Sequence, residues 1–140
     1  MKRKIKVGIS IGDLNGIGFE VIIKSFLDNR MMEFCTPIVF GSSKVASYHR
    51  KALEIKDFSF NIINSIKDAN PKRANLLNVW KEDVEINLGE STAIAGQYAF
   101  KSLSKAVEAL KNEDIDLLVT APINKLNIQQ NENNFIGHTE

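Results

Sequence analysis

The 140-residue sequence contains little of what marks several classes of protein. It has one cysteine, Cys35, which cannot form a disulfide within the chain, and its two histidines, His49 and His138, show no zinc-binding spacing. Its 18 basic and 17 acidic residues form no blocks and leave a net charge of only +1, so we expect no nucleic-acid or membrane partner. These shortages favour a protein of the reducing cytoplasm.

Long hydrophobic runs are also missing. No stretch approaches the roughly 18 apolar residues that a membrane span requires. The basic residues 2–4 precede a short apolar run, but this run contains Gly8 and reaches Asp13 before any cleavage site, so it does not match a signal peptide. The composition, 44% hydrophobic and 25% charged, is typical of a globular domain.

Short apolar runs alternate with longer stretches of helical period, which predicts an α/β fold. We expect strands at 4–11, 37–40, 58–63 and 76–80, and a polar connection at 67–75. Residues 115–120 are almost wholly apolar, which is typical of a central strand covered on both faces.

Three helices are predicted, from Ile17 to about Met31, from Ser42 as N-cap to Ala52 or Leu53, and from Ser91 to about Lys111. Their spacing predicts which residues face inward. In the first helix these are Val21, Ile22, Ser25 and Phe26, and in the third they are Ala95, Ala99, Leu103, Ala106 and Leu110. In the second helix, Val45, Ala46 and His49 recur at helical spacing.

The glycine-rich stretch 12–20, GDLNGIGFE, lies where the first strand ends and a helix begins. Backbone N–H groups and the helix dipole converge at such a place, and glycines let a phosphate or ribose approach the main chain. Its spacing is neither G-x-G-x-x-G nor a P-loop. The alternative is a tight turn in which Asp13 caps the helix and Glu20 interacts with its dipole.

Two further polar stretches are candidates for chemistry. Lys125, after the apolar strand, could pair with phosphate or carboxylate, or could be a solvated residue in a short helix opened by Asn124. His138, Thr139 and Glu140 offer an acid or base, a hydroxyl and a carboxylate, although a loop histidine is more often a surface residue. His49 is interpreted as a surface residue on a polar helix.

Four stretches together resemble the 4-hydroxythreonine-4-phosphate dehydrogenase family. They are GDLNGIGFE at 12–20, LGESTAIAGQ at 88–97, VTAPINK at 119–125 and GHTE at 137–140. Their order and spacing match the family over nearly the whole chain. The first stretch departs from the family's usual GDPAGIGPE at Leu14, Asn15 and Phe19, and the loss of both prolines is expected to soften this turn.

The resemblance implies a three-layer α/β/α fold of the isocitrate and isopropylmalate dehydrogenase type, not a Rossmann fold. Residues 1–140 would be the N-terminal portion of a two-domain enzyme, inactive alone, that works as a homodimer. The enzyme would oxidise 4-phosphooxy-L-threonine with NAD and decarboxylate it to 1-amino-3-phosphooxy-propan-2-one, in pyridoxal 5'-phosphate (vitamin B6) biosynthesis. A divalent metal (zinc, magnesium or cobalt) would stabilise the developing alkoxide.

The family's functional residues carry over to a few positions. Its substrate-binding pair falls on His138 and Thr139, and Asp13 and Lys125 fall on motif positions at the cleft. The metal ligands of the family lie beyond Glu140, so none is expected in this chain, and no catalytic residue is assigned.

Two alternatives stay open. A paralogue could act on a phosphorylated threonate or erythronate instead, because the loops that choose between these substrates are not assignable. A non-catalytic binding or dimerisation module is the alternative of another class. Such a module should fold cooperatively and remain monodisperse, whereas a fragment should expose an apolar sheet edge and aggregate.

Overall fold

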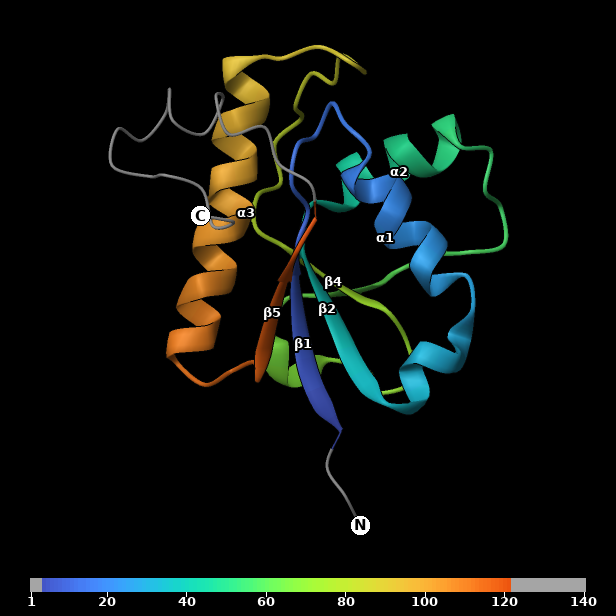
Figure 1. Cartoon of the computed structure of the whole chain (residues 1–140), viewed down its shortest axis with the longest axis vertical. Coiled ribbons are helices and arrows are strands. Elements are labelled where there is room, and N and C mark those ends of the chain that lie inside the picture. Colours follow the sequence, from blue (N-terminus) through green and yellow to red (C-terminus); the bar gives the residue numbers. More distant parts are fainter. Residues whose placement is uncertain (1–3, 122–140) are drawn as a thin grey trace.

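The computed structural model describes residues 4–121. Its elements are, in order, β1 (Ile5–Ser10), α1 (Gly18–Phe26), the 3-10 helix η1 (Asn29–Glu33), β2 (Cys35–Gly41), α2 (Ser43–Ala52), β3 (Asn61–Ile63), the 3-10 helix η2 (Ile66–Asp68), β4 (Asn75–Asn78), α3 (Ala93–Lys111) and β5 (Leu117–Thr120). The strands form one parallel sheet in the order β3-β4-β2-β1-β5, with helices on both faces (Figure 1). The predicted α/β architecture is confirmed.

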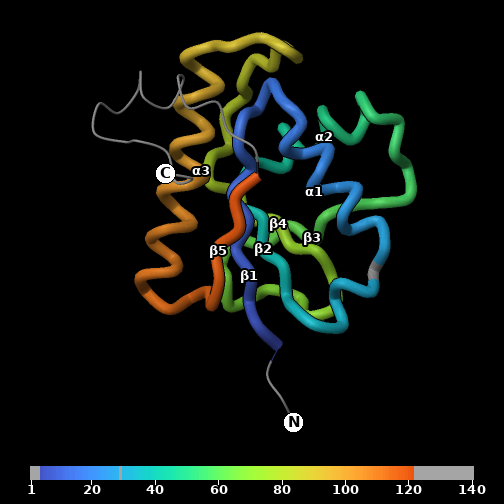
Figure 2. The backbone as a smooth tube through the Cα atoms, viewed as in Figure 1, coloured from blue at the N-terminus to red at the C-terminus, as the bar shows by residue number. Residues whose placement is uncertain are grey.

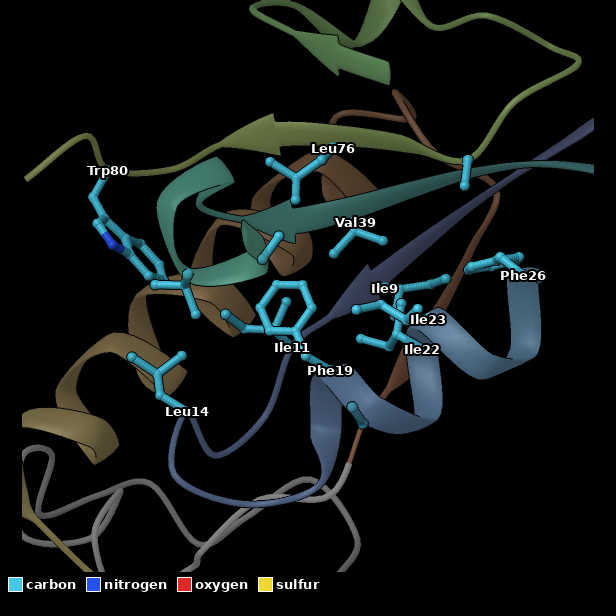
Figure 3. Packing of buried hydrophobic residues seen from close by; sticks show 14 of the residues in the cluster. Ile9, Ile11, Leu14, Phe19, Ile22, Ile23, Phe26, Val39, Leu76 and Trp80 are labelled. Carbon is cyan, nitrogen blue, oxygen red and sulfur yellow. The ribbon is translucent and has the colours of Figure 1, made fainter. Parts of the chain in front are cut away.

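Alternate residues of the strands build two cores, one on each face of the sheet. Val39 and Leu76 point towards α1 and α2, where they join a large cluster around Phe19 (Figure 3). Their neighbours Ile38 and Leu77 point the other way and pack with residues of α3. The backbone trace shows α3 on the opposite side of the sheet from α1 and α2 (Figure 2). Burial of each large apolar side chain contributes about 1.5 to 3 kcal/mol to the free energy of unfolding, so both cores stabilise the fold.

Helix α1 is shorter than predicted, and of its four predicted inward residues only Ile22 and Phe26 are buried. It ends at Phe26, and Asp28 then begins η1 by accepting a hydrogen bond from Arg30 N at 3.0 Å. Val21 is 44% exposed and Ser25 is also exposed, contrary to prediction. The residues that do face the core are Phe19, Ile22, Ile23 and Phe26.

The other two helices lie close to their predicted bounds. In α2 the three residues at helical spacing, Val45, Ala46 and His49, are buried. Ser42 occupies the N-cap position, although its hydroxyl makes no capping hydrogen bond. In α3 the buried stripe is as predicted except at its end, where Ala109 is buried and Leu110 is 37% exposed. No helix within residues 4–121 combines the length and apolar character needed to cross a membrane.

Strand β5 was predicted to be central, but among the described strands it lies at an edge and pairs only with β1. Leu117 and Val119 are 52% and 47% exposed. The apolar run 115–120 predicted a buried strand, but no other element within residues 4–121 covers Leu117 and Val119. The predicted strand at 58–63 is also shorter, because only Asn61–Ile63 pair with β4.

A buried asparagine organises the amino ends of the strands. The Asn75 side chain, 0% exposed, donates to the carbonyl oxygens of Pro37, Asn70 and Arg73 at 2.9 to 3.0 Å. Its Oδ1 accepts from the Asn61 side chain and from Asn70 N, both at 2.8 Å. These bonds hold the polar connection between β3 and β4 against the sheet. Nearby, the half-buried Cys35 begins β2, with its Sγ 3.5 Å from Met31 O.

Candidate functional site

The loop between β1 and α1 is a compact turn built around Asp13. Asp13 Oδ1 accepts a hydrogen bond from Asn15 N at 3.0 Å, and Asp13 O accepts one from Gly16 N at 3.1 Å. Gly12 has a φ of 72°, a backbone conformation that favours glycine. Asp13 thus closes the loop itself and does not cap α1, whose N-cap is Ile17 without a side-chain bond. Its carboxylate is half-buried.

Gly18 brings the start of α1 against two other segments. A Cβ at this position would overlap Ile11 O and would lie 3.5 Å from the Ala121 Cβ, so only glycine fits without movement. Ala121 is itself held at the end of β5, where its N donates to Ser10 O at 3.0 Å. The first loop therefore contacts Ala121, the first residue after β5.

The segment before α3 is joined to the same loop. The Asn15 side chain donates to Glu90 O at 3.0 Å and to Thr92 Oγ1 at 3.1 Å, and it accepts from Asn87 N at 2.8 Å. Thr92 is the N-cap of α3 and accepts from Ala95 N at 3.1 Å. The first two stretches thus meet Ala121, which belongs to the third, where parallel strands end (Figure 1). Ligands of open α/β sheets bind at this edge.

His49 supports the first loop from α2. Its ring is 4% exposed and stacks on Phe19, with ring centroids 5.4 Å apart. Its Nε2 lies 2.9 Å from Leu14 O, and because a carbonyl oxygen can only accept, Nε2 carries the proton. Burial lowers the pKa of His49 below its ordinary 6.5, and the bond to Leu14 opposes this only in part. The interpretation of His49 as a surface residue was wrong.

Ser102 anchors the other face of this edge. Its hydroxyl, on α3 and 0% exposed, donates to Phe40 O at 2.5 Å and accepts from Ile11 N at 3.1 Å. The ends of β1 and β2 are thereby fixed to the helix. The hydroxyls of Ser10 and Ser42, also at the ends of these strands, are buried and have no hydrogen-bond partner within residues 4–121. Unsatisfied polar groups thus gather at this edge.

Only one of the predicted site residues falls within the described part of the chain. Asp13 lies in the first loop, as the sequence predicted, whereas Lys125, His138 and Thr139 lie outside the described residues. Sequence reasoning missed Asn15 and Ser102, because a polar side chain in a loop or helix carries no local signal that it will be buried.

The described residues do not supply a metal centre. Residues 4–121 contain no group of three or more histidine, cysteine, aspartate or glutamate side chains that could hold an ion. A hollow of about 400 Å³ lies elsewhere, between η2 and the C-terminal half of α3, lined by residues such as Lys6, Ser65 and Lys105. It has no contact with the loops that follow β1 and precede α3.

Loops gathered at the carboxyl ends of parallel strands define a class of α/β protein that binds small molecules at that edge. The comparison with family models is more specific. The chain belongs to the family of the pyridoxal phosphate biosynthetic protein PdxA, whose model matches residues 33–140. The predicted family is confirmed.

Individual relatives agree with this assignment. A 4-hydroxythreonine-4-phosphate dehydrogenase of Bacteroides thetaiotaomicron is 45% identical over 99% of this chain and 38% of its own length. A Clostridium botulinum protein, provisionally named as a D-threonate 4-phosphate dehydrogenase, is 36% identical over 100% of this chain and 42% of its own. The crystal structure of a Burkholderia phymatum 4-hydroxythreonine-4-phosphate dehydrogenase matches with a TM-score of 0.86 and 26% identity, covering 99% of this chain and 42% of that one. The chain thus spans about two fifths of the length of these relatives.

Proposed function

We propose that this chain is the N-terminal portion of a two-domain dehydrogenase that oxidises 4-phosphooxy-L-threonine in pyridoxal 5'-phosphate biosynthesis. The relative from Bacteroides thetaiotaomicron, which carries that activity in its name, supports this assignment. The structural observation that carries the proposal is the meeting of the Asp13 loop, the segment ending at Thr92 and Ala121 at the carboxyl edge of the sheet. This edge would form one wall of the active site.

The proposed reaction has two steps. The secondary alcohol at carbon 3 gives its hydride to NAD and its hydroxyl proton to a base, which forms a ketone. The resulting 3-keto acid then loses carbon dioxide, and protonation of the enolate gives 1-amino-3-phosphooxy-propan-2-one. A site for this substrate must hold a phosphate and orient the alcohol towards the nicotinamide.

We assign substrate binding to His138 and Thr139, which carry an imidazole and a hydroxyl able to donate hydrogen bonds. Lys125 is a candidate for pairing with the phosphate or carboxylate as a point charge. Asp13 is the candidate that can be placed, since its carboxylate is half-buried within the loop at the carboxyl edge. All four assignments rest on matching motif positions.

The remaining parts of the enzyme would come from outside this chain. A divalent metal (zinc, magnesium or cobalt) would polarise the alcohol, and its ligands would follow Glu140. Residues 4–121 contain no group of three or more histidine, cysteine, aspartate or glutamate side chains that could hold it. We further propose a homodimer, and a cytoplasmic location that the single cysteine favours.

The nearest rival is a dehydrogenase of a phosphorylated threonate or erythronate, favoured by the similarity to the Clostridium botulinum protein. The two substrates differ at carbon 2, where one carries an amino group and the other a hydroxyl. The test is to purify the full-length enzyme and follow NADH formation with 4-phosphooxy-L-threonine and with D-threonate 4-phosphate. Turnover confined to the threonate would overturn the pyridoxal assignment. No turnover with either substrate would overturn both the pyridoxal and the threonate assignments.

A further inference from the structure

Asn15 differs from Asp13, the other polar residue at the start of the first loop, because it is almost completely buried. Its side chain is 2% exposed although it lies in a turn between a strand and a helix. Both N–H groups of the amide are used, one by Glu90 O and one by Thr92 Oγ1, and Oδ1 accepts from Asn87 N. The orientation of the amide is therefore determined, because a flipped amide would set Oδ1 against Glu90 O.

The main chain of Asn15 takes part in the same contact. Its carbonyl oxygen accepts from Gly89 N at 2.8 Å, and its N–H donates to Asp13 Oδ1 at 3.0 Å. One residue thus connects the Asp13 carboxylate to a segment more than 70 positions further along the chain. That segment has no helix or strand of its own between β4 and α3, and Leu88 is 52% exposed. Asn15 forms four hydrogen bonds to this segment, to Asn87, Gly89, Glu90 and Thr92.

The three departures of this loop from the usual motif belong to one set of contacts. On the α2 side, His49 donates a hydrogen bond to Leu14 O and its ring stacks on Phe19. Asn15 reaches the α3 side. The loss of two prolines was expected to soften the turn, but the loop is instead fixed by tertiary contacts from two directions. The alanine of the usual motif has no side-chain amide and could not form the hydrogen bonds that Asn15 makes to residues 87–92.

We propose that Asn15 is a positioning residue for the reaction proposed above. It fixes the Asp13 loop and the start of α3 as a single unit, so that Asp13 keeps a constant place at the carboxyl edge. The inference depends on the proposed function only for the chemistry that Asp13 serves. A displacement of about 1 Å at a reacting centre can lower a rate by about a hundredfold, so a loose loop should reduce kcat.

The first test uses Asn15→Ala in the full-length enzyme, which installs the alanine of the usual motif. Hydrogen exchange at the Asn87 and Gly89 amides should accelerate by about tenfold or more. Asn87 N loses its acceptor, Asn15 Oδ1, and Gly89 N keeps Asn15 O as acceptor in a loop that the side chain no longer holds. The value of kcat should fall by about tenfold or more, with a smaller change in KM. Unchanged amide exchange would overturn the inference.

A stability control separates positioning from simple loss of folding. Ile115→Val removes one methyl group from the core cluster under α3, far from the loop contacts. At a temperature where both variants are fully folded, it should keep the kcat of the wild-type enzyme. If Asn15→Ala keeps that kcat too, Asn15 is only structural and the positioning role is wrong.

A second pair of variants guards against an Asn15→Ala protein that does not fold. Thr92→Val removes the hydroxyl that accepts from Asn15, whereas Thr92→Ser retains it. The valine variant should show faster exchange at Gly89 and lower kcat, and the serine variant should restore both. Equal behaviour of the two would overturn the inference. A wild-type enzyme without turnover would overturn the proposed function, while the exchange rates would still decide whether Asn15 joins the two segments.

Discussion

The two ends of the sheet are each held by a buried asparagine, but the two side chains connect very different parts of the chain. Asn75 bonds to Pro37, Asn61 and the connection 70–73, all within the segment that builds β2, β3 and β4. Asn15 bonds to residues 87–92, which follow the whole of that segment. One amide closes a local connection, and the other joins distant loops.

This difference indicates what each residue is for. A local network at the amino edge stabilises a polar connection that could not otherwise lie against the sheet, because buried backbone groups need partners. A long-range network at the carboxyl edge also fixes the relative position of two loops that belong to the family motifs. We therefore expect changes at Asn75 to alter stability alone, and changes at Asn15 to alter stability and catalysis together.

The largest expected effect on stability is that of Asn75→Ala. Several buried carbonyl and N–H groups lose their partner, so the free energy of unfolding should fall by about 3 kcal/mol. Urea denaturation measures this loss, and kcat of the folded fraction should be unchanged. Asn64→Ala, at an exposed asparagine beside β3, should cost less than about 0.5 kcal/mol. A loss of kcat on Asn75→Ala would remove the contrast between the two edges.

Ser102→Ala should have the next largest effect. It leaves Phe40 O and Ile11 N without the hydroxyl that joins them, at a cost of about 1 to 2 kcal/mol. The matched control is Ser104→Ala, at an exposed position of the same helix, which should leave stability unchanged or slightly raised. Equal unfolding midpoints for the two variants would show that the carboxyl edge does not depend on Ser102.

His49 should make the carboxyl edge sensitive to pH. Burial lowers the pKa of His49 in the folded state, so the unfolded chain binds the proton more readily. The stabilisation is present above the ordinary pKa of 6.5 and is lost as the pH falls below it towards the lowered pKa. Unfolding followed between pH 7.5 and pH 5.5 should show this loss, and His49→Gln should flatten it. An equally steep pH dependence in the variant would assign the effect to other groups.

The smallest effect is expected on the surface of α1. Lys24 Nζ lies 2.8 Å from Glu20 Oε2, but their side chains are 58% and 39% exposed. Glu20→Gln should therefore change the free energy of unfolding by less than about 0.5 kcal/mol, as measured by thermal denaturation. Lys24→Gln is the control for the pair and should behave alike. A loss above 1 kcal/mol would mean that the Glu20 carboxylate has a partner beyond Lys24.

Much of the fold could be predicted because hydrophobic period is a local property of the sequence. The short apolar runs of β1 and β2 and the stripe of α3 predicted these elements to within a few residues. The errors arose where tertiary contacts decide. In helix α1, Val21 was wrongly predicted to face inward because it is as apolar as its buried neighbours Ile22 and Ile23. Strand β5 was predicted to be central because its residues are apolar, but apolar residues do not show which strands pair with it.

The candidate site was less predictable than the fold. The glycines of the first loop and the following Asp13 indicated a special turn, since φ values such as that of Gly12 require glycine. Nothing in the sequence indicated the hydrogen-bond partners of Asn15, His49 and Ser102, because each obtains its partner from a segment at least 35 residues away. Polar residues of this kind become recognisable only when the fold brings their partners together.

Cys35, the single cysteine of these 140 residues, can be used as a labelling site. Cys35 opens β2 at the end of the sheet opposite the loops, and burial raises the pKa of its thiol, an effect that nearby Lys4 only partly offsets. Alkylating reagents attack the thiolate, so labelling should be slow in the native protein and fast once η1 separates from β2. A fluorophore attached at Cys35 would report opening of the amino edge without any engineered site, and without touching the loops around Asn15.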